Sequence, residues 1–208
     1  MPLLSGAMGA RRYRVLGAKD PIDRDELLEL LGEHAFHEPP SAAKGGENHG
    51  WVSMHNLCVT EFVHDDSFYH QYLCFSLRMD RKALPARLLK ALLELRCTSW
   101  MEETGRERVP AAVKREIREQ LELELFPRQL PNVGVHDVCW DLNRGLVWFF
   151  NNGNKANEIF RIHFARTFSV DTQPVGPLHL LADHKHADAW VPRIDAIGHS
   201  DYRATEGS

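Results

Sequence analysis

Apolar residues recur at helical spacing in two segments near the middle of the chain. Their apolar positions are Leu84, Leu88, Leu92 and Leu95 in the first segment and Val109, Val113, Ile117, Leu121 and Leu125 in the second. A spacing of three or four residues places such side chains on one face of a helix. The pattern therefore predicts two amphipathic helices, separated by a break at Glu103–Gly105.

Shorter runs rich in β-branched and aromatic residues predict strands at 12–16, 57–63, 71–79, 135–142 and 145–150. The second and third of these runs are expected to pair as antiparallel neighbours, connected by the polar segment 63–69. The last two surround Asn143-Arg144-Gly145, and Gly145 suits the left-handed position of a three-residue hairpin.

Two further helices are predicted from their first residues. Asp23 precedes Glu26 by three residues, a variant of the capping box, and introduces a helix over 23–34. Asn154 is expected to cap a helix whose apolar face contains Ala156, Ile159, Phe160, His163, Phe164 and Phe168. Residues 37–50 have the composition of a loop, and 171–208 show no period and are predicted to be extended or partly disordered.

The predicted order of elements, β-α-β-β-α-α-β-β-α, connects neighbouring strands by hairpins rather than crossovers. It indicates an α+β fold, in which amphipathic helices pack on an antiparallel sheet. We assign residues 1–181 to one domain that contains a helical, finger-like basic segment at 81–135. Residues 182–208 are predicted to form a flexible C-terminal tail.

The charge is distributed unevenly along the 208 residues. The whole chain has 25 basic and 29 acidic residues, and its net charge of -4 excludes a strongly basic nucleic-acid module as a description of the entire protein. Residues 81–128 nevertheless carry 11 basic and 8 acidic side chains, a net charge of +3. The segments before and after them are acidic, so only the middle of the chain is basic.

Several features favour a cytoplasmic protein. No run of about eighteen apolar residues is present to span a membrane. The first arginines follow the first apolar residues, the reverse of a secretory signal. The cysteines contain no C-x-x-C pair and lie in apolar segments, which predicts buried, reduced thiols at Cys58, Cys74, Cys97 and Cys139.

The common catalytic motifs are absent from the sequence. It contains no G-x-S-x-G elbow, P-loop, G-x-G-x-x-G after a strand or H-E-x-x-H. Glu61, Asp65 and Asp66 could serve a metal-dependent nuclease, but no basic partner stands at a recognisable spacing, and a solvated loop is the simpler interpretation. We therefore predict that the protein is not an enzyme and needs no cofactor.

Twelve histidines raise the question of a metal site. His184 and His186 form an H-x-H pair that would place both rings on one face of a strand, where they could share a zinc ion. The alternative is a polar tail without metal, since no third or fourth ligand can be named. His163 lies on the apolar face of its helix and is predicted to be a core histidine with one satisfied nitrogen, whereas His37 and His49 show no ligand spacing.

The basic middle segment is a stronger indication of function. Its candidate DNA-contacting residues lie on or beside the two predicted helices and are Arg87, Lys90, Arg106, Arg108, Lys114, Arg115, Arg118 and Arg128. They could form a phosphate-binding surface, whose affinity would depend on salt because bound counterions are released. The alternative is a surface of internal ion pairs, because Arg115 and Arg118 each precede a glutamate by four residues.

A series of short motifs extends over most of the chain. They are Arg12-Tyr13-Arg14, Ala35-Phe36, Gly50-Trp51-Val52, Leu84-Pro85, Glu103-x-Gly-Arg106, Leu125-Phe-Pro-Arg128, Trp140-Asp141, Arg144-Gly-Leu-Val147 and Pro174-x-Gly-Pro177-Leu178. In this order and spacing they resemble the RdgC family of recombination-associated proteins, over roughly residues 6–181.

The resemblance implies an α+β, nucleoid-associated protein without a catalytic centre. It implies a ring-like homodimer that encircles double-stranded DNA with little sequence preference and modulates recombination by occluding the DNA. The eight basic side chains then become candidate contacts to the phosphate backbone, which carry no base-reading code.

Two features depart from the family. Its members extend well beyond this chain, so only their N-terminal portion is expected here, without the C-terminal half that helps to close the ring. The segment 129–134, where the family has an exposed aromatic residue in a finger, offers only Leu130 and Val133, so no aromatic wedge is expected. The alternative function is therefore a protein-interaction module that kept the fold and lost DNA binding. A hydrolase using His184 and His186 is a third hypothesis.

Overall fold

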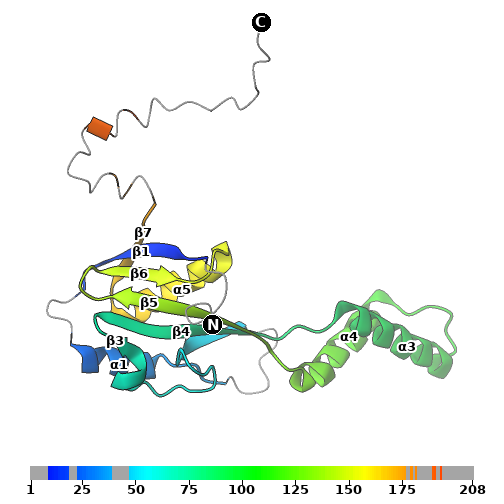
Figure 1. The fold of residues 1–208 in the computed structure, drawn as a ribbon. Coiled ribbons are helices and arrows are strands. Elements are labelled where there is room, and N and C mark those ends of the chain that lie inside the picture. Colours follow the sequence, from blue (N-terminus) through cyan, green and yellow to red (C-terminus); the bar gives the residue numbers. More distant parts are fainter. Residues whose placement is uncertain are drawn as a thin grey trace, which may run out of the picture.

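One antiparallel sheet forms the body of the protein (Figure 1). The computed structural model describes residues 9–18, 23–38, 47–176, 179, 181, 189–190 and 193. Within them the strands are β1 (Arg11–Leu16), β2 (Glu47–Val52), β3 (Phe68–Tyr69), β4 (Tyr72–Arg81), β5 (Asn132–Asp141), β6 (Leu146–Phe149) and β7 (Asp171–Pro174). Their order is β2-β4-β5-β6-β1-β7, with β3 paired to β4, and all of these pairs are antiparallel.

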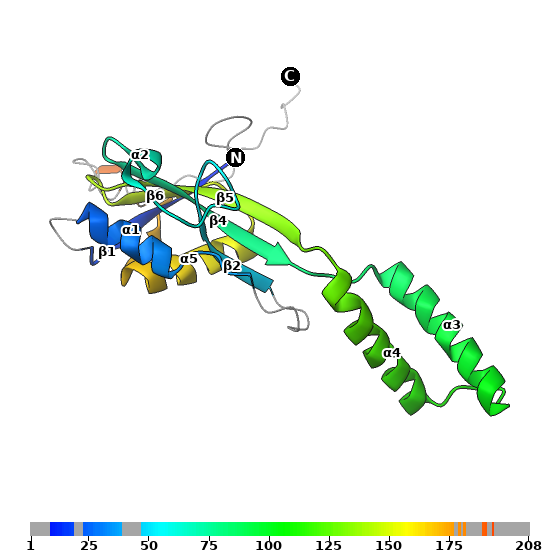
Figure 2. The same ribbon diagram turned by 90° about the horizontal axis from the view of Figure 1, so that it is seen from below.

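Helices lie on one face of this sheet and beyond one of its ends (Figure 2). Helices α1 (Arg24–Glu33) and α5 (Asn154–Phe168) cover the face, whereas α3 (Ala86–Thr104) and α4 (Ala111–Leu125) form a hairpin that projects away from it. The short helices α2 (His64–Ser67) and η1 (Phe126–Arg128) complete the described helical elements. The predicted α+β class, with helices packed on an antiparallel sheet, is confirmed.

The core lies between the sheet and helices α1 and α5. Alternate residues of a strand point to the same face, so Leu73, Phe75 and Leu77 of β4 all reach this core and are fully buried. Helix α5 faces them with Phe160, Phe164 and Phe168. Ring contacts connect the two layers: the Phe149 and Phe160 rings stack at a centroid distance of 4.4 Å.

The longest predicted elements are confirmed. The two helices of the middle segment are α3 and α4, and Gly105 ends the first in the left-handed conformation, with φ of 64°. The capping prediction for α1 is also right, because the Asp23 carboxylate accepts a hydrogen bond from the backbone N–H of Asp25 at 3.0 Å. Gly145 has φ of 60° in the turn between β5 and β6, as expected, but the loop has the four residues 142–145 rather than three, because Asp141 pairs with Leu146.

One strand prediction is wrong. Residues 57–63 form no strand, and the partner of β4 on this side is β2, which begins inside the predicted loop 37–50. Burial explains the difference: Trp51 and Val52 of β2 are fully buried, whereas Val59 and Val63 remain exposed. High β-propensity favours a strand only where the side chains find a packed surface.

One smaller prediction also needs correction, and a second is made more specific. The residue that precedes α5 as its cap is Gly153, and the Asn154 side chain instead accepts a hydrogen bond from Arg11 at 2.7 Å. The segment predicted to be extended begins with a regular strand, β7. The H-x-H pair at His184 and His186, and most of the predicted tail, lie outside the described residues.

The four cysteines are free thiols, but they differ in burial. Cys74 and Cys97 are buried, as predicted, and Cys139 is half-buried. Cys58 is exposed, because the segment that contains it is not the buried strand that its composition predicted.

His163 confirms its predicted place in the core. It is buried on α5, and its Nε2 lies 3.3 Å from the carbonyl oxygen of His34, so one nitrogen is satisfied. The His49 ring packs edge-on against it at a centroid distance of 4.9 Å. Burial, together with the neighbouring His49, lowers the pKa of His163 to about 4.

Gly50 in β2 is required by a close approach between two backbones. A Cβ atom at this position would lie 2.4 Å from Cα of Phe36 and 2.6 Å from its nitrogen. We therefore expect Gly50→Ala to lower the free energy of unfolding by about 1–3 kcal/mol, measured by urea denaturation. Gly32→Ala is the matched control, since open space surrounds Gly32 in α1, and there a gain of roughly 0.5–1 kcal/mol is expected. Equal effects of the two substitutions would contradict this account.

His163 makes stability depend on pH in the acid range. Its pKa is lower in the folded protein than in the unfolded chain, so the unfolded state binds more protons as the pH falls from the ordinary histidine range towards about 4. Between about pH 7.5 and about pH 5, we expect the free energy of unfolding to drop by about 2 kcal/mol more in the natural protein than in His163→Gln. Urea denaturation at both pH values measures this difference. Parallel pH profiles for the two proteins would show that His163 is not the cause.

Candidate nucleic-acid interface

The projecting helical hairpin is inserted in the sequence between strands β4 and β5. Strands β4 and β5 pair along all their residues, ending at the partners Arg81 and Asn132, and the chain between these two residues forms α3 and α4. Pro85 and Pro110 each stand directly before a helix. Because N–H groups at the start of a helix have no acceptor within it, the lack of an N–H in proline breaks no helical hydrogen bond. The hairpin is therefore held at one place, its root, and extends into solvent as Figure 2 shows.

The interior of the hairpin is small. Of the residues in α3 and α4, only Cys97 and Leu121 are buried. Leu95 remains 65% exposed although it belongs to the apolar stripe predicted for α3, and Leu123, on the polar side of α4, is 56% exposed. A groove of about 500 Å³ between the helices is lined by Trp100, Ile117 and polar side chains from both helices. The hairpin thus exposes apolar as well as charged surface.

The structure separates the eight predicted DNA-contacting residues into two groups. Arg87, Lys90 and Arg128 lie at the root of the hairpin, on the first turn of α3 or just after α4. The other five lie at or near its far end, in the loop between the helices or on the first half of α4, and are Arg106, Arg108, Lys114, Arg115 and Arg118. Helix α3 has 19 residues, which corresponds to about 28 Å, so the groups occupy opposite ends of the hairpin.

Three of the eight cations form the internal ion pairs that the alternative interpretation expects. Lys90, Arg115 and Arg118 each lie within 4.0 Å of a glutamate four residues later, the shortest distance being 2.9 Å between Arg118 Nε and Glu122 Oε1. Their side chains remain 59–80% exposed. Such exposed pairs contribute little to stability and are screened by salt, so they can be exchanged for another anion.

The remaining five cations make no ion pair with the residues that the structure describes. Among them, Arg106 lies over the ring of Trp100 at 5.8 Å from its centroid. Arg87, Arg108, Lys114 and Arg128 are exposed. The hairpin therefore offers, at both of its ends, exposed cations that have no ion-pair partner among the described residues.

Trp100 is a residue that the sequence analysis missed. It is half-buried in α3 near the far end of the hairpin, where its ring is contacted by Arg106. Aromatic rings beside cations are common in surfaces that contact nucleic acids. The signal in the sequence was its position five residues before Gly105, the glycine that ends α3, because this places Trp100 near the far end of the hairpin.

The finger position predicted at 129–134 is wrong. These residues lead directly into β5, which begins at Asn132, and form no hairpin of their own. The projecting element of this part of the chain is the α3–α4 hairpin. Leu130, at 89% exposed, nevertheless lies at its root as an uncovered apolar side chain.

The other candidate chemistry is not assembled by the fold. Among the described residues, no three His, Cys, Asp or Glu side chains are grouped so that they could hold a metal ion. Asp65 and Asp66 lie exposed on the short helix α2, and Glu61 is exposed in the segment before it. No described helix combines the length and apolar character needed to cross a membrane.

Comparison with known families identifies the type of protein. Residues 10–191 match the model of a family described as "Putative exonuclease, RdgC". A comparison with curated proteins gives no match.

The small interior of the hairpin predicts how it should respond to substitution. Leu121→Ala removes one of its two buried side chains, and we expect it to accelerate hydrogen exchange of α3 and α4 amides by at least about tenfold, while β4 and β5 stay unchanged. Leu123→Ala, two residues later on the exposed side, is the control and should leave exchange nearly unaltered. Mass spectrometry of exchanged peptides makes the comparison. Acceleration throughout the sheet would show instead that hairpin and body unfold together.

Proposed function

Because the chain belongs to the RdgC family, we propose that it is a nucleoid-associated protein that binds double-stranded DNA without sequence preference. In this proposal it modulates recombination by occupying DNA rather than by catalysis. The observation that carries it is the projecting hairpin with exposed cations at both ends. Phosphate contacts need only positive charge at suitable spacing, and they do not need a concave, base-reading site.

Each of the eight hairpin cations has the role of a phosphate-pairing group. Arg87, Lys90 and Arg128 would contact the backbone at the root, and the five residues of the far end would contact it about one helix length away. Arg115 and Arg118 would exchange their glutamate partners for phosphates, which costs little because both pairs are exposed.

The proposal includes a homodimer that acts in the cytoplasm, at the nucleoid. The exposed Leu95, Leu123 and Leu130 support self-association, because apolar side chains of this size gain free energy when a partner covers them. A second copy would also double the number of cations that face one duplex. Mass measurement by light scattering tests the oligomeric state.

DNA binding is tested by the fluorescence anisotropy of a labelled duplex at several salt concentrations. With six or more phosphate contacts, affinity should fall by about 10³ or more between roughly 50 and 200 mM salt. The triple variant Lys114→Gln, Arg115→Gln, Arg118→Gln should reduce the slope of log affinity against log salt by up to about three. Neutralisation by glutamine removes the charges without creating new repulsion beside Glu119 and Glu122.

The matched control removes three positive charges from the body of the protein through Arg24→Gln, Arg144→Gln and Arg166→Gln. It should leave the salt slope close to that of the natural protein. An equal loss in both variants would indicate attraction by net charge and would refute the hairpin surface. Cleavage of the duplex in the presence of magnesium would contradict action by binding alone.

The second candidate function is a protein-interaction module. It is favoured by the pairing of three hairpin cations with glutamates and by the exposed leucines on the same element. If no duplex is bound even at low salt, this function replaces DNA binding as the role of the hairpin.

A further inference from the structure

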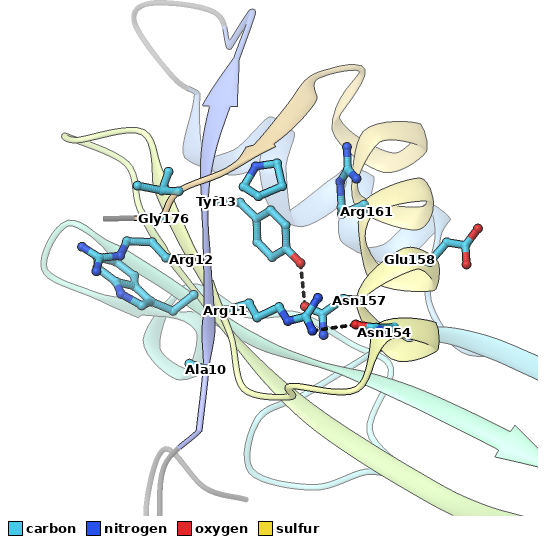
Figure 3. A pocket seen from close by; sticks show the side chains of 12 residues that line it. Ala10, Arg11, Arg12, Tyr13, Asn154, Asn157, Glu158, Arg161 and Gly176 are labelled. Carbon is cyan, nitrogen blue, oxygen red and sulfur yellow. Dashed lines mark hydrogen bonds between the residues drawn. The ribbon is translucent and has the colours of Figure 1, made fainter. Parts of the chain in front are cut away.

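A cavity of about 650 Å³ lies at the open edge of the sheet, beside the first turns of α5. It belongs to the body of the protein and shares no residue with the hairpin. Figure 3 shows Arg11, Tyr13 and Arg161 on the side of β1 that faces α5, and Arg12 on the opposite side. Its size lies within the usual range for small-molecule sites, about 300–1,000 Å³.

The end of β7 creates this cavity. The last paired residues of β1 and β7 are Tyr13 and Pro174, and one more backbone hydrogen bond, from Val175 to Arg12, is made before the chain departs. Arg11 therefore has a strand on one side only, where it pairs with Phe149 of β6. The opening reaches both faces of the sheet, since Arg12 and its cross-strand partner Trp148 also line it.

Three arginines and one carboxylate, that of Glu158, give the described lining of the cavity a net positive charge. Arg11 donates to the backbone oxygen of Asn152 at 2.8 Å, and Arg161 donates to the backbone oxygen of Thr172 at 3.1 Å. Both acceptors are uncharged, so the guanidinium groups are held in position without being neutralised. The Arg12 side chain makes no hydrogen bond or ion pair within the described part of the chain, and Glu158 is the lone carboxylate among the described lining residues.

The part of the cavity wall formed by Tyr13 and Asn157 carries no charge, and hydrogen bonds hold both side chains in position. The Tyr13 hydroxyl donates to Oδ1 of Asn157 at 2.6 Å (Figure 3), and the Asn157 amide donates to the backbone oxygens of Asn151 and Gly153. Burial raises the pKa of Tyr13, which keeps the phenol protonated. Helix α5 begins at this wall without a side-chain cap, so its N-terminal N–H groups add positive potential.

We propose that this cavity binds a nucleoside phosphate. Arg11 and Arg161 on one side of β1 and Arg12 on the other outnumber the one lining carboxylate, and the guanidinium group is the preferred partner of a phosphate. The volume exceeds the needs of a phosphate alone. The half-buried indole of Trp148, beside Arg12, supplies an aromatic face on which a base can stack.

Two sources could supply this ligand, a free nucleotide or the phosphorylated end of a nucleic-acid strand. Calorimetric titration with deoxyadenosine monophosphate tests the first source. Anisotropy of a short single-stranded oligodeoxynucleotide, with and without a 5′-phosphate, tests the second. Saturable binding of either phosphorylated probe supports the proposal and identifies the source.

The double variant Arg11→Gln, Arg12→Gln should weaken binding of the active probe by at least about tenfold. Arg166→Gln, which removes a charge from the far half of α5 outside the cavity, is the control and should bind normally. Trp148→Leu should weaken the nucleotide but leave inorganic phosphate unaffected. Thermal unfolding of each variant confirms that the fold is kept.

Several results would overturn the proposal. They are failure of both phosphorylated probes to bind, equal binding of the oligonucleotide without its phosphate, and equal affinity of the double variant and the control. None of these results bears on duplex binding by the hairpin, because Lys114, Arg115 and Arg118 are unchanged in all of these proteins.

Discussion

The pairing of β4 with β5 is the interaction on which the rest of the molecule depends. The pairing extends from Tyr72 with Asp141 to Arg81 with Asn132. Even the pair that is closest in sequence, Arg81 and Asn132, is separated by 50 residues. One face of this ribbon supplies the centre of the core, and its end carries the hairpin. The same pairing therefore determines both where the protein is stable and where it projects into solvent.

This division gives the two parts different constraints. Side chains of the body are selected by packing, as the close approach at Gly50 and the stacked Phe149 and Phe160 rings show. The hairpin buries only Cys97 and Leu121, so most of its residues are free of packing constraints. A surface of that kind can change its charge and exposed apolar groups at little cost in stability, which suits an element that contacts other molecules.

The sequence predicted those elements whose signal is local. The stripes of α3 and α4, the Asp23 cap and the turn at Gly145 depend on neighbours a few residues away. β2 was missed because its burial depends on Trp51 meeting distant residues, among them Thr167, whose hydroxyl accepts a hydrogen bond from the indole. The hairpin cations were found by composition, but their division between root and far end required the fold. The cavity was not predicted, because its arginines come from β1 and α5.

The two basic surfaces differ in how their charges are held, and this difference bears on what each can recognise. On the hairpin, Arg115 and Arg118 are exposed and paired with glutamates of the same helix, so in the proposal a phosphate at any register would replace the partner. In the cavity, Arg11 and Arg161 are oriented by uncharged acceptors of the backbone, which leaves their charge available in one geometry. Exchangeable cations suit a ligand with a repeating charge, whereas oriented cations suit a single anion of defined shape. In the two proposals, the hairpin would hold a duplex without reading its sequence, and the cavity would distinguish a terminal phosphate from the phosphates within a strand.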